Sequence, residues 1–239
     1  MEIKNSIALV TGSNRGIGKA LVEALADAGA KKIYASARNV AQLDFKNRQT
    51  EIVPLQLDIA DHHSILEVTS QAKDVNLLFN NAGVLDFGDI LDVPIDHIKR
   101  NLDTNFFGTL DVSRMFAPVI TANGGGAIVN SLTLLSLASM PGLAAYNASK
   151  AAAWSMTLSL RASLADKNIR VHGVFPGAVD TDMLDGVEIP KTKPAEVAQA
   201  IINGVNEDHE DIFPDPMSIE VYGAWCKDHK AVEKQFAQM

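Results

Sequence analysis

The sequence predicts an α/β protein with parallel strands, and its first thirty residues carry the observations behind this prediction. Residues 6–10 are short, apolar and followed closely by glycine, which is typical of a buried parallel strand. Glycines follow at positions 12, 16 and 18, and residues 19–28 then show the apolar spacing of a helix. A strand, a glycine-rich turn and a helix in this order form a binding site for phosphate groups.

The glycine-rich turn has the spacing Gly-x-x-x-Gly-x-Gly instead of the commoner Gly-x-Gly-x-x-Gly. Gly12 allows a tight turn, Gly16 lets the backbone approach a pyrophosphate, and Gly18 lets the helix pack closely on the strand. We expect Ser13 or Asn14 to cap the helix. The alternative is that the glycines serve only a tight turn.

The second strand is expected at residues 32–35, and the residues after it bear on the choice of coenzyme. An acidic side chain there binds the ribose 2′-hydroxyl of NAD, whereas an arginine accepts the 2′-phosphate of NADP. Here Arg38 follows the strand without an acid, and Arg15 in the glycine-rich turn is expected to lie near it. Two guanidinium groups suit a phosphate dianion, so we expect NADPH over NADH. The alternative is that both arginines are solvated surface charges.

Two further strands are expected at residues 52–57 and 76–79, with a short helix at 40–48 and another helix at 64–71. Asp58 closes the first of these strands, where it could accept a hydrogen bond from an adenine amino group or could simply end the strand. The second runs into Asn80-Asn81-Ala82-Gly83, whose Asn and Gly residues permit a turn and a close approach of the backbone to a ligand.

Tyr146 and Lys150 are four residues apart in an alanine-rich segment that no Gly or Pro interrupts before Asp166. In a helix this spacing places both side chains on one face. A phenol has an ordinary pKa of about 10, and a nearby ammonium lowers it. The two residues form a proton-transfer pair if they face a pocket; otherwise they belong to an ordinary helix face.

Composition excludes several other classes. The 21 Lys and Arg against 29 Asp and Glu give a net charge of −8 without a basic run, which argues against a nucleic-acid surface. The single cysteine, Cys226, allows no internal disulfide, and neither it nor the six histidines form a metal-ligand pattern. We see no signal peptide and no membrane-spanning run, so we expect a soluble cytoplasmic protein.

Five features in order resemble the short-chain dehydrogenase/reductase family over about residues 3–215. They are the glycine-rich turn from Thr11, Asn-Asn-Ala-Gly from Asn80, Asn105, Tyr-x-x-x-Lys from Tyr146, and Pro-Gly from Pro176. The resemblance implies one domain over residues 1–239, with a doubly wound (Rossmann-type) parallel sheet of about seven strands and helices on both faces. It also implies a nicotinamide coenzyme, hydride transfer and no metal.

The resemblance also implies which residues contact NADPH or NADP⁺. In the family the Pro-Gly turn touches the nicotinamide carboxamide, and Thr181 lies near that amide and the pyrophosphate. The expected coenzyme contacts are Gly12, Ser13, Asn14, Arg15, Gly16, Ile17, Gly18, Arg38, Asp58, Ile59, Asn81, Ala82, Gly83, Tyr146, Lys150, Pro176, Gly177, Val179 and Thr181.

Four residues are expected to be catalytic by the same resemblance: Asn105, Thr133, Tyr146 and Lys150. Asn105, in a long helix expected at 96–122, would hold a water that links the lysine to solvent. The family usually has Ser thirteen residues before the Tyr, where this chain has Thr133. Threonine keeps the hydroxyl but is stiffer. Ser131 and Ser136 are the alternative hydroxyls.

The expected activity is NADPH-dependent reduction of an aldehyde or ketone, with Tyr146 as proton donor. The alternatives are an alcohol or hydroxysteroid dehydrogenase working oxidatively, an acyl-thioester reductase, or a non-catalytic NADPH sensor. A short connection at 182–193 suggests an open site for varied or bulky carbonyl substrates. The alanine-rich helices near Leu102 and Ala144 suit a homodimer or homotetramer.

The remaining elements complete the expected order. They are strands at 127–130, 169–175 and 212–214 and a helix at 194–203. Residues 215–239 resemble the family only weakly, and Trp225 and Phe236 are expected to pack this segment down or to lie at a subunit contact.

Overall fold

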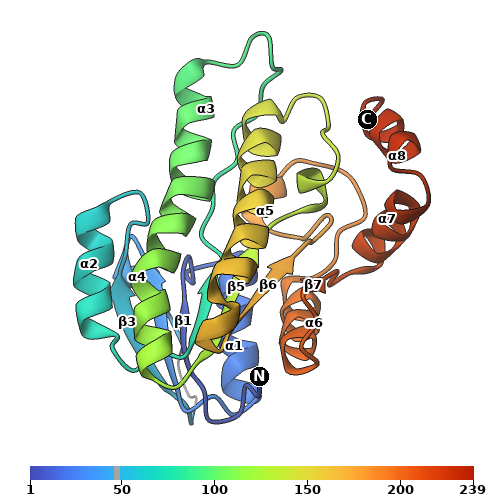
Figure 1. Ribbon diagram of the computed structural model, residues 1–239. Coiled ribbons are helices and arrows are strands. Elements are labelled where there is room, and N and C mark those ends of the chain that lie inside the picture. Colours follow the sequence, from blue (N-terminus) through green and yellow to red (C-terminus); the bar gives the residue numbers. More distant parts are fainter. Residues whose placement is uncertain (46–48) are drawn as a thin grey trace.

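The computed structural model describes residues 1–45 and 49–239, and its centre is a parallel sheet with the strand order β3-β2-β1-β4-β5-β6-β7 (Figure 1). The strands are β1 (Ile7–Val10), β2 (Lys32–Ala37), β3 (Glu51–Gln56), β4 (Leu77–Asn80), β5 (Gly126–Ser131), β6 (Ile169–Val174) and β7 (Asp211–Ile212). This confirms the predicted doubly wound α/β fold. The order reverses between β1 and β4, where such folds bind their ligands.

Helices cover both faces of the sheet, and each face has its own apolar core (Figure 1). Ala8 and Val10 of β1 face the helices α1 and α6. Leu9 faces the opposite side, toward α2, α4 and α5. Every second residue of a strand points to the same face, so one buried strand contributes to both cores. The helices are α1 (Gly16–Asp27), α2 (His62–Gln71), α4 (Thr109–Ala122), α5 (Ala144–Leu164) and α6 (Pro194–Asn206).

The long helix expected at 96–122 is divided, which corrects the prediction. The segment runs as α3 (Ile95–Leu102), a π-helical turn η2 (Asp103–Gly108) and α4. A π turn adds one residue to the helical ladder and often marks a functional site. The extra residue places Asn105 against the loop after β4 and brings Gly108 close to Ile59, whose carbonyl oxygen would be 2.5 Å from a Cβ at Gly108.

Other boundaries differ by a few residues from the prediction. The first helix begins at Gly16, three residues before its expected start, and the helix α6 extends to Asn206. The helix expected at 40–48 is only a 3₁₀ turn, η1 (Val40–Gln42), and residues 46–48 of that prediction lie outside the described residues. No helix in the described part of the chain is long and apolar enough to cross a membrane.

The C-terminal segment forms α7 (Pro216–Lys227) and α8 (His229–Phe236). Val232 and Phe236 of α8 are buried in a cluster with Ala138, so this helix packs on the loop that follows β5. Of the two alternatives for Phe236, the structure therefore shows packing within the chain. The segment covers the loop next to the site described below.

Candidate active site

A cavity of about 560 Å³ opens at the carboxyl edge of the sheet, around the strand reversal. It is lined by residues from the loops after β1, β2, β3, β4, β5 and β6 and from α5. The predicted site residues that line it are Gly12, Asn14, Arg15, Gly16, Ile17, Gly18, Arg38, Asp58, Ile59, Asn81, Ala82, Gly83, Tyr146, Lys150, Pro176 and Thr181. The cavity therefore brings together segments that are far apart in the sequence.

Other predicted residues lie beside this cavity without lining it. Ser13 is buried, and its hydroxyl donates to the carbonyl of Val10 over 2.6 Å. The amide of Gly177 donates to Asp215 over 2.8 Å, and Val179 is buried in the core under α1 and α6. Asn105 and Thr133 are also absent from the lining, and their contacts are described below.

The glycine-rich turn is clamped to the loop after β4. Gly12 has a φ of +67°, and a Cβ there would be 2.9 Å from the Cα of Ala82. A Cβ at Gly18 would be 2.5 Å from the Nδ2 of Asn81. The hydroxyl of Thr11 accepts hydrogen bonds from the backbone amides of Asn81 and Ala82, each at 3.0 Å. Larger residues at Gly12 or Gly18 would separate the two segments.

The beginning of α1 has no side-chain cap, which corrects the expectation of a cap from Ser13 or Asn14. The N-cap residue is Arg15, and it makes no capping hydrogen bond. The hydroxyl of Ser13 is turned toward β1, and the amide of Asn14 donates to Gln42 over 3.0 Å. The first backbone amides of a helix have no intrahelical acceptor, so these are available to a phosphate group.

Tyr146 is a buried phenol, 8% exposed, at the third position of α5. Burial raises the pKa of Tyr146, and a side-chain hydrogen bond with Thr133 lowers it by a smaller amount. The net direction is upward, whereas the sequence led us to expect a pKa lowered by the lysine. Tyr146 therefore holds its proton in this structure, which is the form that a proton donor requires.

Thr133 stands at the end of the loop after β5. Its hydroxyl accepts a hydrogen bond from the amide of Leu135 over 3.3 Å, which begins the 3₁₀ turn η3 (Leu134–Ser136). Of the rival hydroxyls, Ser131 lines the cavity, whereas Ser136 is buried and its oxygen has no hydrogen-bond partner. The hydroxyl of Thr133 donates to the carbonyl of Pro176 over 3.5 Å, and of the three hydroxyls it is the one that acts on the pKa of Tyr146.

Lys150 lies one turn beyond Tyr146 on α5 and is 5% exposed. Its ammonium donates to the carbonyl of Ser131 over 2.7 Å and lies 5.7 Å from the centre of the Tyr146 ring. Burial lowers the pKa of Lys150 to about 8. The lysine is thus held at the cavity wall by the end of β5.

Asn105 fixes the loop after β4 from the π turn. Its side chain accepts from the amide of Val84 and donates to the carbonyl of Val84, both at 2.9 Å. It also donates to the hydroxyl of Ser149 over 2.9 Å. A Cβ at Gly83 would be 3.1 Å from Asn105 and 3.7 Å from the ammonium of Lys150. The side chain is committed to protein groups, and the water relay stays a prediction.

The two arginines expected at a 2′-phosphate differ in their partners. Arg15 forms an ion pair with Asp182 at 2.9 Å. Arg38 is exposed and has no ion pair with any described carboxylate. Asp58 uses one oxygen to accept from the amide of Ala60 over 3.0 Å. All three line the cavity.

Some cavity residues were not predicted as site residues. They are Ala37, Asn39, Gln42, Leu57, Ala60, Val84, Arg100, Thr104, Leu132, Asp182 and Met183. Ser131, which was considered only as an alternative hydroxyl to Thr133, also lines the cavity. Val84 and Leu132 directly follow or precede predicted residues, so their place in the chain was a usable signal. Asp182 likewise follows the predicted Thr181, whereas Arg100 reaches the cavity through tertiary contacts that no local pattern reveals.

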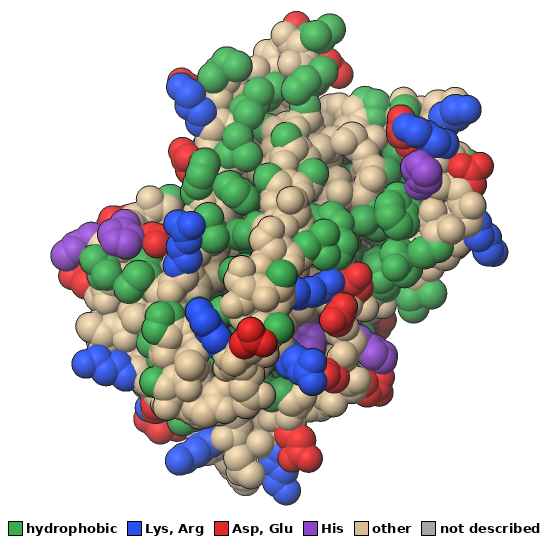
Figure 2. Space-filling view, viewed as in Figure 1, with side chains coloured by type: hydrophobic (Ala, Val, Ile, Leu, Met, Phe, Trp, Pro, Cys, Tyr) green, Lys and Arg blue, Asp and Glu red, His purple; other side chains and the backbone are tan. Residues whose placement is uncertain are grey.

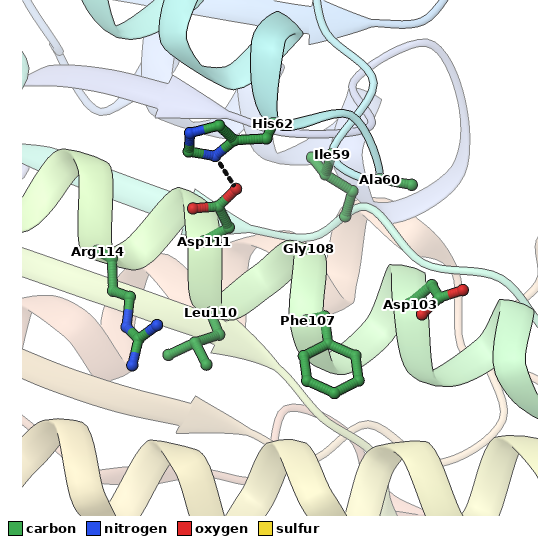
Figure 3. A pocket seen from close by; sticks show the side chains of 9 residues that line it. All are labelled: Ile59, Ala60, His62, Asp103, Phe107, Gly108, Leu110, Asp111 and Arg114. Atoms are coloured by element: carbon green, nitrogen blue, oxygen red, sulfur yellow. Dashed lines mark hydrogen bonds and ion pairs between the residues drawn. The ribbon is translucent and has the colours of Figure 1, made fainter.

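A second hollow of about 390 Å³ lies on the outer flank of the loop after β3. Figure 3 shows His62 and Asp111 pointing toward each other, joined at 2.6 Å between Nδ1 and Oδ2, while Phe107 and Arg114 point away from this pair. Ile59 lines both hollows. The His62–Asp111 contact joins the first residue of α2 to the helix α4.

Comparisons with known proteins agree with this geometry. The chain is 33% identical to versicolorin reductase of Emericella nidulans over 190 residues, which are 76% of this chain and 72% of the relative. It is 36% identical to D-erythrulose reductase of Gallus gallus over 178 residues, 74% and 72% of the two chains. A short chain dehydrogenase from Burkholderia cenocepacia, solved in complex with NADP, superposes with a TM-score of 0.93 at 34% identity, covering 99% of each chain.

A family model described as short chain dehydrogenase matches residues 6–191, which is more than half of the chain. The match includes the glycine-rich turn, the loop after β4, and Tyr146 with Lys150. Together with the doubly wound sheet and the coenzyme-sized cavity at its reversal, it identifies the chain as an oxidoreductase of the short-chain dehydrogenase/reductase family.

Proposed function

We propose that the protein reduces an aldehyde or ketone to an alcohol with NADPH, and that Tyr146 donates the proton. The observation that carries this proposal is the buried Tyr146 phenol, with Lys150 one turn further along α5, at the wall of the same cavity that the glycine-rich turn lines. Reduction requires a protonated phenol as the proton donor, and the raised pKa of Tyr146 supplies that form.

The residues present fit a dinucleotide coenzyme. The first backbone amides of α1 have no side-chain cap and lie at the cavity, beside the glycine-rich turn. Arg38 and Arg15 line the end of the cavity beyond β2, where they would hold a 2′-phosphate. The similarity to the Burkholderia cenocepacia enzyme in complex with NADP supports NADP(H) in particular.

The chain would supply position and proton transfer, whereas the bound nicotinamide would supply the hydride. Thr133 and Tyr146 would hold the substrate oxygen between their hydroxyls, and Tyr146 would transfer its proton to that oxygen. Lys150, fixed by Ser131, would bind the nicotinamide ribose and stabilise the phenolate that the proton transfer leaves. Asn105 would keep Val84 and Gly83 in place beside the lysine.

The substrate side supports a carbonyl compound with apolar groups. Leu132, Pro176, Val84 and the partly exposed Met183 line this part of the cavity. The connection from residue 182 to 193 is short and leaves the mouth open, so we propose that varied or bulky carbonyls enter. Versicolorin reductase and D-erythrulose reductase, both named as reductases, support reduction as the direction.

The test is NADPH oxidation against a panel of aldehydes, aryl ketones, diketones and steroids, with Tyr146→Phe as the matched variant. We expect turnover to fall by roughly 10²- to 10⁴-fold in Tyr146→Phe while NADPH binding persists. Tyr222→Phe is the control, because Tyr222 stacks on Phe213 away from the cavity. Tight NADPH binding without any turnover in the wild type would instead favour a sensor.

We also propose that the protein is a cytoplasmic homodimer or homotetramer. Figure 2 shows hydrophobic side chains over the face formed by α3, α4 and α5, next to a more charged rim. Phe107 beside α4 and Leu158 on α5 are 54% and 45% exposed. Light scattering of the purified protein tests the assembly, and a monomer at micromolar concentration would contradict it.

A further inference from the structure

An ion pair joins the glycine-rich turn to the segment after β6. The Nη1 atom of Arg15 lies 2.9 Å from the Oδ2 atom of Asp182, and each side chain is 66% exposed. Both residues line the coenzyme-sized cavity. Arg15, which is expected to bind a phosphate group, is therefore paired with Asp182, whose carboxylate would repel that phosphate.

The backbone holds these two residues opposite each other. A Cβ at Gly16, the residue after Arg15, would be 3.1 Å from the Cγ2 of Thr181, the residue before Asp182. The amide of Leu184 donates to the carbonyl of Thr181 over 2.9 Å, which turns the chain back at Asp182. The proximity of Arg15 and Asp182 thus follows from packing between two loops.

Arg38, the other arginine at this end of the cavity, is in a different situation. It is exposed and forms no ion pair with a carboxylate in residues 1–45 and 49–239. Of the two guanidinium groups available to a 2′-phosphate, one is therefore free and the other is neutralised by Asp182.

We propose that Asp182 sets how strongly the site discriminates between NADPH and NADH, because its carboxylate competes with the 2′-phosphate for Arg15. This inference rests on the proposed NADP(H) function. It adds a residue, Asp182, whose charge weakens binding of the 2′-phosphate. A bound 2′-phosphate must either draw Arg15 away from Asp182 or remain near an uncompensated carboxylate, and both weaken its binding. NADH has an uncharged hydroxyl at that position, so its binding neither requires Arg15 to leave Asp182 nor brings a second negative charge near that carboxylate.

The test compares dissociation constants, measured by coenzyme fluorescence, for NADPH and NADH in the wild type and in Asp182→Asn. We expect NADPH to bind about two- to fivefold more tightly in the variant, the size of effect for an exposed, screened ion pair. The affinity for NADH should change less, so the NADPH preference should rise. Adenosine 2′,5′-bisphosphate and AMP, which lack nicotinamide, should show the same selective change.

Two controls separate this role from general charge effects. Asp185→Asn removes the same charge three residues away, from a carboxylate that forms no ion pair among the described residues, and should leave the NADPH preference unchanged. In an Arg15→Gln background, Asp182→Asn should lose its selective effect, because the competition requires the guanidinium of Arg15.

Three results would overturn the inference while leaving the proposed function intact. They are an unchanged NADPH preference in Asp182→Asn, weaker NADPH binding in that variant, and an equal change in Asp185→Asn. Weaker binding would mean that Asp182 holds Arg15 ready for the phosphate. A wild type that binds no NADPH or prefers NADH would instead overturn the proposed coenzyme, and the inference with it.

Discussion

Lys150 donates to the backbone carbonyl of Ser131 over 2.7 Å, so the end of β5, and not the phenol of Tyr146, is the hydrogen-bond partner of the ammonium. The residues are nineteen positions apart, and the contact fixes the lysine at the cavity wall. Within α5 the spacing of four places Lys150 near the Tyr146 ring, but β5 determines where its charge lies.

The buried lysine makes stability depend on pH. Burial lowers the pKa of Lys150 from 10.5 to about 8, so between these values the unfolded chain holds a proton that the folded protein has lost. The cost of burying the charge is present below pH 8 and is relieved as the pH rises toward 10.5. Across this window, the free energy of unfolding of the wild type should therefore rise by up to roughly 3 kcal/mol relative to that of Lys150→Met.

Urea unfolding of both proteins at pH 7 and pH 10 measures this difference. Comparing the two removes the contribution of other groups that titrate in the same range, because they are common to both proteins. A difference in unfolding free energy that stays constant between the two pH values would contradict the lowered pKa of Lys150.

Thr133 should matter for chemistry more than for coenzyme binding. Thr133→Val keeps the shape of the side chain but removes the hydroxyl that acts on Tyr146. Turnover should therefore fall by roughly 10- to 100-fold, which corresponds to the loss of one or two neutral hydrogen bonds to the substrate oxygen, and NADPH affinity should change little. Thr133→Ser is the matched control and should keep most activity. Full activity in Thr133→Val would transfer the role to Ser131 or Ser136.

Arg38 should contribute directly to coenzyme choice. Arg38→Asp removes a free guanidinium and adds a charge that repels a phosphate, so the NADPH-to-NADH affinity ratio should fall by roughly 10- to 100-fold. Arg114→Asp makes the same charge change on α4, outside the large cavity, and serves as the control. An unchanged NADPH preference in Arg38→Asp would remove Arg38 from the site.

Gly18 and Gly223 should respond oppositely to alanine. A Cβ at Gly18 would be 2.5 Å from Asn81 Nδ2 and closer still to the carbonyl oxygen of Gly12, so Gly18→Ala should destabilise the protein and abolish coenzyme binding. Gly223 lies within α7 with no atom within 4 Å of a Cβ, and Gly223→Ala should stabilise by about 0.5–1 kcal/mol. Thermal unfolding of both variants gives the comparison, and equal effects would be inconsistent with the close packing at Gly18.

The sequence alone determined the features that depend on neighbours along the chain. Short apolar runs predicted the strands, since a buried parallel strand needs apolar residues on both faces. The spacing of Gly12, Gly16 and Gly18 predicted the turn, and the four-residue spacing predicted that Tyr146 and Lys150 share a side of one helix. These patterns sufficed for the fold class, whereas many of the cavity-lining residues were named through the resemblance to the family.

Only the tertiary structure decided the features in which distant segments compete for the same polar group. Ser13 could cap a helix by its position, but the backbone amide of Ser36 on β2 donates to its hydroxyl over 3.3 Å. The helix around Asn105 is apolar enough to be continuous, but the contact with Val84 accompanies a π turn. Burial determines the pKa of Tyr146, since the penalty on a buried phenolate depends on everything packed around it.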